Sequence, residues 1–136
     1  DLILAVDPYR TTSHTHRDHR KSGIVAVDAA FTYAWSYLHF PEQITEEGLE
    51  PHRVEQALLW GGEDPDVFVD VAPYLGVKVD SLGAHVSQMS SSRDVRLERT
   101  KNNLGRHKET TGLQYVEAFR RITFNLGSLE WQLLHT

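Results

Sequence analysis

An unbroken apolar run at the start of the chain constrains the fold more than any other feature. The residues from Leu2 to Val6 are all apolar, and Asp7 and Pro8 follow at once. A strand that is buried on both faces of a parallel sheet has this continuous pattern, whereas a strand with one solvated face alternates. The run therefore predicts a central strand over residues 2–6. In α/β folds the loops that carry chemistry follow the carboxyl ends of such strands.

The rest of the chain alternates between helical and extended patterns. Spacings of three and four residues predict a long helix from Asp18, as its N-cap, to Leu38, with Phe31 and Trp35 on the apolar face. Further elements are expected as strands over 54–60 and 67–71, helices over 73–88 and 93–104 with Gly105 as C-cap, and a late strand from 115. This order indicates an α/β fold with a parallel sheet flanked by helices.

Composition excludes several classes of protein. Fourteen Lys and Arg stand against nineteen Asp and Glu, a net charge of −5, so no cationic surplus supports binding to nucleic acid. No run approaches the roughly 18 apolar residues of a membrane span. The chain has no Cys, which excludes a disulfide scaffold and a thiol nucleophile. We expect a cytoplasmic protein, although secreted proteins can also lack Cys.

A cluster of histidines lies in the loop between the first strand and the first helix. His14, His16 and His19 fall within six positions, with Asp18 among them. Neutral imidazole is the commonest protein ligand for zinc, and a carboxylate on the other ring nitrogen fixes its tautomer. A solvated histidine-rich loop fits the same spacing. From the residues alone, both interpretations stay open.

Three motifs carry a resemblance to a known family. His16-Arg17-Asp18-His19 resembles the H-x-D-H motif of the zinc-dependent N-acetylglucosamine deacetylases, the PIG-L or LmbE-like family. The segment from Lys78 to Gln88 is similar to that family's K-x-x-A-L-x-x-H-x-S-Q helix, with Ser81 in place of the Ala. Tyr115 to Arg120 resembles its Y-x-E-A-F-R strand. The three motifs occur in the family's order.

One family motif has no counterpart in the chain. The H-P-D-D loop, which in the family supplies two zinc ligands and the general base, matches no segment of these residues. The resemblance therefore implies that residues 1–136 are the C-terminal portion of a single deacetylase domain, with a partial Rossmann-like sheet. It also implies pairing with the missing N-terminal half, or an oligomer.

The resemblance assigns roles to individual residues. It implies that His19 is a zinc ligand, and that His16 protonates the leaving amine or stabilises the oxyanion. Asp18 would then orient His16 and favour its charged form. His85 and Gln88, three apart on one predicted helix face, would line the pocket, or else satisfy buried backbone groups. His14 would approach the acetyl carbonyl, or else lie exposed in the loop.

Three hypotheses for function follow. The first is part of a zinc-dependent amide hydrolase that removes an acetyl or other acyl group from an N-acetylglucosamine-type conjugate. Whether the chain is an enzyme by itself stays open, because half of the site is absent. The second is a non-catalytic zinc- or sugar-binding half that needs a second chain. The third is a stand-alone metal module of His14, His16 and His19. The aromatic residues Tyr33, Trp35, Tyr37 and Trp60 could stack on a sugar ring, although for Trp35, on the apolar stripe with Phe31 and Leu38, core packing is the better explanation.

Overall fold

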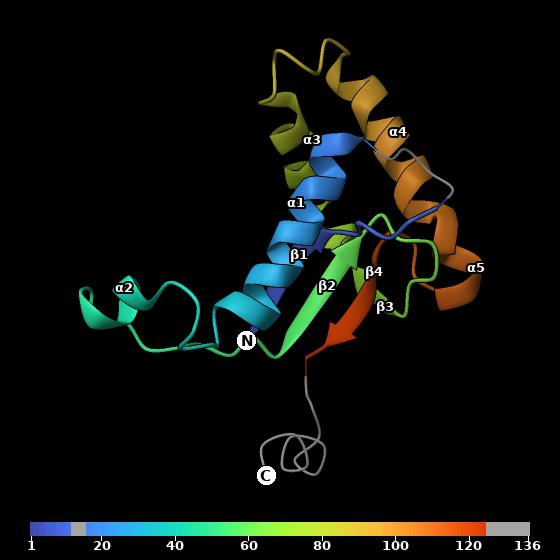
Figure 1. Cartoon of the computed structure of the whole chain (residues 1–136). Coiled ribbons are helices and arrows are strands. Elements are labelled where there is room, and N and C mark those ends of the chain that lie inside the picture. The colour runs from blue at the N-terminus through green and yellow to red at the C-terminus, as the bar shows by residue number, and fades with distance from the viewer. Residues whose placement is uncertain (12–15, 125–136) are drawn as a thin grey trace. The chain divides into compact units, whose positions relative to one another are not determined.

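The computed structural model describes residues 1–11 and 16–124 in two compact units (Figure 1). The first unit comprises Asp1–Val67 and Phe119–Thr136, and the second comprises Phe68–Ala118. The elements follow the order β1 (Leu2–Val6), α1 (Arg17–Asp28), a π-helical turn (Ala29–Tyr33), α2 (Pro41–Thr45), β2 (Gln56–Trp60), β3 (Val67–Asp70), a 3-10 turn (Ala72–Tyr74), α3 (Leu75–Gly83), α4 (Arg93–Leu104), a second 3-10 turn (Gly105–His107), α5 (Lys108–Thr111) and β4 (Val116–Thr123).

The strands form a mixed sheet in the order β1-β2-β4-β3. β1 and β2 are parallel, with Leu2 opposite Gln56, and β4 runs antiparallel to β2, with Phe119 opposite Trp60. The predicted α/β class is therefore confirmed. The predicted central position of residues 2–6 is wrong within the described residues, because β1 pairs only with β2 and lies at the edge. Its outward side chains Leu2 and Leu4 are 53% and 64% exposed.

The core of the first unit lies between the sheet and α1. Ala5, Ala57 and Leu59 are buried from β1 and β2, and Ala26 and Val27 of α1 pack against them. Small side chains on both strands let the helix approach closely. At Gly23 the helix lies directly against the end of β1, because a Cβ atom there would collide with the carbonyl oxygen of Val6 and would touch the Pro8 ring. The apolar spacing predicted this packing correctly.

The first helix differs from the prediction at both ends. Its N-cap is His16 rather than Asp18, and the π-helical turn closes at Ala34. A turn then begins at Ser36, whose hydroxyl oxygen accepts the Leu38 N–H. Leu38 is consequently 88% exposed and leaves the predicted apolar face. The predicted aromatic positions do pack, since Phe31 in the π-helical turn stacks on Trp35, which lies just beyond that turn, and on Phe124.

In the second unit α3 and α4 lie side by side (Figure 1). Val79 of α3 is fully buried, and Arg93 of α4 donates to the Asp80 carboxylate at 2.7 Å. On the same helix Lys78 donates to Glu117 of β4 at 2.5 Å. This contact connects α3 to β4. Each of the two partly buried charges is balanced by the other.

The predicted extension of α3 to Gln88 is wrong. The helix ends at Gly83, where the side chain of Arg96 from α4 lies close against the backbone. Beyond Gly83 the chain forms turns in which the His85 N–H donates to Leu82 O, and the Gln88 and Met89 N–H groups both donate to His85 O. His85 and Gln88 therefore occupy an exposed turn and do not share a helix face. β3, α4, its C-cap Gly105 and β4 lie close to their predicted positions.

No helix within the described residues has both the length and the apolar character needed to cross a membrane.

Candidate functional site at the carboxyl edge of the sheet

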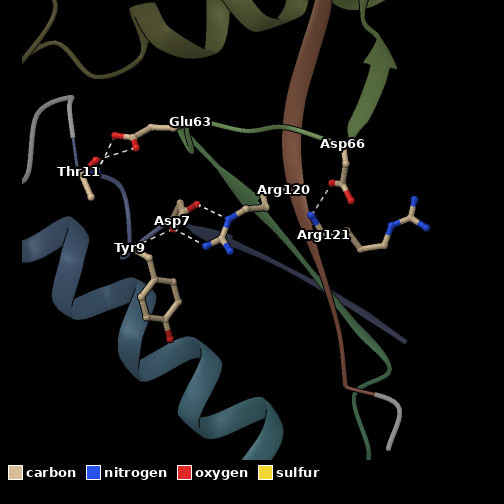
Figure 2. Close-up of polar contacts among 7 residues, drawn as sticks. All are labelled: Asp7, Tyr9, Thr11, Glu63, Asp66, Arg120 and Arg121. Carbon is tan, nitrogen blue, oxygen red and sulfur yellow. Dashed lines mark hydrogen bonds and ion pairs between the residues drawn. The ribbon is translucent and has the colours of Figure 1, made fainter. Parts of the chain in front are cut away.

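A buried carboxylate occupies the end of β1. Asp7 follows the last residue of the strand and is 2% exposed. Arg120 of β4 donates to it twice, from Nε to Oδ2 at 2.8 Å and from Nη2 to Oδ1 at 2.9 Å, and the Tyr9 N–H adds a third bond at 2.9 Å (Figure 2). The Asp7 N–H itself donates to the carbonyl oxygen of Trp60. Asp7 thus joins the ends of β1 and β2 to β4.

The environment of Asp7 favours its charged form. Burial by itself would raise the pKa of this carboxyl group. The hydrogen bonds from Arg120 and from the Tyr9 N–H, together with the positive charges of Arg120 and Arg10, outweigh burial and hold the pKa of Asp7 below its ordinary value. The same pairing raises the pKa of Arg120. Both groups therefore stay charged near pH 7 and are not suited to exchange a proton there. The pair has a structural role, because it links the end of β1 to β4.

A second carboxylate holds the loop that follows β1. Glu63, in the turn after β2, accepts the Thr11 N–H at 2.6 Å and the Thr11 hydroxyl at 2.9 Å (Figure 2). Tyr9, two residues before Thr11, is also in contact with the sheet, because the guanidinium of Arg120 lies over its ring, 5.6 Å from the centroid. The loop is therefore attached to the sheet at Tyr9 and at Thr11.

His16 starts α1 by capping it with its own side chain. Its Nδ1 accepts the Asp18 N–H at 3.2 Å, which satisfies one of the unpaired donors of the first turn. In the neutral ring this bond leaves the proton on Nε2. The Asp18 carboxylate lies 3.6 Å from the same Nδ1, at ion-pair distance when the ring is protonated. Asp18 can thus contact His16 in two ways. Its N–H donates to Nδ1 of the neutral ring, and its carboxylate can pair with Nδ1 of the protonated ring.

His19 lies one turn further along the helix. Its ring centroid is 5.4 Å from that of His16, and 6.0 Å from the Trp60 ring, which meets it edge-on at 68°. Trp60 ends β2 and is 44% exposed. The two histidines therefore stand at the carboxyl edge of the parallel pair, where His19 is in edge-on contact with the indole ring that ends β2.

The structure brings together only some of the residues that the sequence predicts for the site. His16, Asp18 and His19 are gathered in the first turn of α1. His14 lies outside the described residues, and His85 and Gln88 belong to the second unit.

Three further residues of this edge, Asp7, Thr11 and Glu63, carry no motif that singles them out in the sequence. The available signal is position, because all three lie shortly after β1 or β2, where α/β folds place functional groups.

The described residues fit a zinc ion only in part. His16 and His19 offer imidazole nitrogens and Asp18 offers a carboxylate, which are donor types that zinc accepts. Within residues 1–11 and 16–124, however, no three His, Asp or Glu side chains lie close enough together to hold one metal ion. A catalytic zinc usually takes three protein ligands. A complete site would need at least one ligand from outside the described residues.

Comparison with known proteins supports the fold. No protein-family model matches the chain. The structure is similar to that of an N,N′-diacetylchitobiose deacetylase from Pyrococcus horikoshii, solved with its inhibitor, with a TM-score of 0.76 at 21% sequence identity. The likeness covers 97% of this chain and 50% of that chain. The chain therefore has the fold of part of a deacetylase and spans half the length of that protein.

Proposed function

We propose that the chain is one part of a zinc-dependent amide hydrolase that removes an acetyl group from an N-acetylglucosamine-type substrate. The observation that carries the proposal is the position of His16, Asp18 and His19. They open α1 at the carboxyl edge of the parallel pair, in a fold similar to half of a chitobiose deacetylase. The proposal includes a second part, in the same or another polypeptide, that completes the site.

Amide hydrolysis needs a polarised carbonyl and a proton for a poor leaving group. A bound zinc supplies polarisation of the acetyl carbonyl and easier ionisation of the attacking water. In the proposal His19 contributes one ligand to that metal. His16, whose capping bond keeps a proton on Nε2, stabilises the oxyanion or protonates the amine. Asp18 stabilises the imidazolium through the 3.6 Å contact with Nδ1.

The experiment compares the two histidines in the complete enzyme. His19→Ala should lower zinc content and acetate release together. His16→Asn keeps a side chain that caps helices well, so the fold and the zinc should remain while the rate falls by about 10² to 10⁴. His52→Ala is the control, because His52 pairs with Asp1 at the amino end of β1. Metal content by emission spectroscopy and acetate release from an N-acetylglucosaminide are the measurements.

Three results would change this assignment. If His16→Asn loses zinc as completely as His19→Ala, the ligand and the acid are exchanged. If neither substitution alters acetate release, the proposed activity is wrong. Tight one-to-one zinc binding by the 136-residue chain in calorimetry would favour the stand-alone metal module instead.

The second candidate is a non-catalytic zinc- or sugar-binding half that works with another chain. Because no three metal donors lie close together within residues 1–11 and 16–124, this half would need donors from the other chain to bind zinc. The two candidates differ in turnover once the complete protein is assembled. Binding of N,N′-diacetylchitobiose without release of acetate would support the non-catalytic half.

A further inference from the structure

The structure separates the four aromatic residues that could stack on a sugar ring. Three of them follow α1 in the chain: Tyr33, Trp35 and Tyr37. Their segment lies near the amino end of β1, because the Ala34 carbonyl accepts the His52 N–H and the His52 ring lies 2.8 Å from the Asp1 carboxylate. Trp60 is the one of the four that lies at the carboxyl edge of the parallel pair, since it ends β2.

The backbone of Trp60 is held from several directions. In the sheet Trp60 stands opposite Val6 of β1 and Phe119 of β4. Its carbonyl oxygen accepts the Asp7 N–H at 2.9 Å. Two residues later the chain passes so close to Asp7 that a Cβ atom at Gly62 would collide with the carboxylate. The indole ring therefore projects from a fixed point of the fold, although Trp60 is 44% exposed.

This exposed indole lies beside the candidate histidines. α1 and β2 run in opposite directions, so the first turn of the helix and the end of the strand lie at the same edge (Figure 1). The ring centroids of Trp60 and His19 are 6.0 Å apart, and the ring planes meet at 68°. A small molecule bound at His19 is therefore close enough to reach the indole as well. Small-molecule sites commonly combine aromatic surface with a few polar groups in this way.

We propose that Trp60 is a substrate-binding residue, whose indole packs against the sugar ring of the substrate. The inference rests on the proposed function for its effect on turnover. The faces of a pyranose ring carry C–H groups, which pack against an aromatic surface and exclude water. In the proposal Trp60 touches the sugar and not the acetyl carbonyl. It therefore contributes to substrate binding and to the choice of an acylated amino sugar, and little to the chemical step.

The kinetic test uses matched variants of the complete enzyme. Trp60→Leu should raise KM for N,N′-diacetylchitobiose by about 10-fold and change kcat less than about threefold, because it removes a contact made equally before and during the reaction. Trp60→Phe keeps an aromatic face, so its KM should stay within about threefold of wild type. Inhibition by acetate, which has no ring, should change less than about twofold in Trp60→Leu.

Tyr37→Leu is the control. Tyr37 is also an exposed aromatic residue, at 62%, but it belongs to the segment near the amino end of β1. Its loss should leave KM and kcat within about twofold. An unchanged KM in Trp60→Leu would overturn the proposal. So would a loss of zinc in step with kcat in that variant, measured by emission spectroscopy, because Trp60 would then act by supporting His19.

A second readout is independent of turnover. In the complete protein after treatment with a chelator, the indole N–H signal of Trp60 in NMR, assigned by its absence from Trp60→Phe, should shift when N,N′-diacetylchitobiose is added. The signal of Trp35, which stacks on Phe31, should stay in place. An unmoved Trp60 signal would overturn the proposal even if the enzyme is active. If the signal moves but the untreated enzyme releases no acetate, the proposed function fails and Trp60 remains a sugar-binding residue.

Discussion

Asp7 and Arg120 are 113 positions apart in the chain, and they form a two-bond ion pair at 2.8 and 2.9 Å. The carboxylate is buried at the end of the first strand, and the guanidinium is one-third exposed on the last strand. Because β2 lies between these two strands in the sheet, the pair connects β1 to β4 across β2. It also receives the first N–H of the loop that leads to His16.

Arg120→Met should destabilise the chain. The substitution leaves the Asp7 carboxylate buried without its partner, which costs about 3–5 kcal/mol in a fully buried pair. Because Arg120 is one-third exposed, solvent screens part of this, and we expect a loss of roughly 2 kcal/mol in urea unfolding. Arg121→Met is the control. Its side chain points away from Asp7 (Figure 2), so its loss should stay within about 0.5 kcal/mol. Equal losses of unfolding free energy in Arg120→Met and Arg121→Met would show that the Asp7–Arg120 pair does not stabilise the chain.

The contribution of Asp7 to stability should disappear in acid. Its pKa is lower in the folded chain than the ordinary value of 3.8, so the folded state binds this proton less readily than the unfolded state. The stabilisation is therefore fully present above the ordinary pKa and is lost as the pH falls through the lower folded value. The unfolding free energies of wild type and Asp7→Asn should differ by a constant amount near neutral pH and converge in acid. A constant difference down to pH about 2 would contradict the shift.

Gly23→Ala and Gly76→Ala should have opposite effects, although both glycines lie inside helices. At Gly23 a Cβ would collide with the Val6 carbonyl, whereas at Gly76 the nearest atom is the end of the Arg93 side chain at 3.9 Å. Overpacking at Gly23 should destabilise by about 1–3 kcal/mol. Gly76→Ala should be neutral or stabilise by up to about 1 kcal/mol. Thermal unfolding of both variants is the measurement, and a neutral Gly23→Ala would show that α1 can move away from β1.

The 136-residue chain should associate in solution. Leu2 and Leu4 project from a strand that is paired on one side only among the described residues, and exposed apolar edge strands promote association. Leu4→Lys should reduce the association, because charge on an edge strand opposes pairing. Leu38→Lys is the control, since Leu38 is 88% exposed but lies outside the sheet. Light scattering checks the mass, and a stable wild-type monomer would contradict the prediction.

The sequence predicted the grouping of three candidate residues in the first turn of α1, but it did not predict where the remaining candidates lie. His16, Asp18 and His19 are close in the chain and share one helical turn, so their spacing was sufficient to group them. His85 and Gln88 were expected on a helix that ends before them, because the packing of Arg96 against Gly83 is a contact between two helices. A single-helix pattern does not contain that contact.

The sequence by itself determined the α/β class, the positions of the strands along the chain and the start of the first helix to within two residues. These depend on local apolar spacing and on side chains that bond within a few residues of themselves. Only the tertiary structure decided that Asp7 pairs with Arg120, that Glu63 holds Thr11 and that Trp60 meets His19. Each of these contacts joins strands or loops that are far apart in the chain, so it depends on sheet order and register. The sequence shows which side chains carry a charge or a ring. Which residue each of them pairs with depends on the fold, because only the fold brings distant strands and loops together.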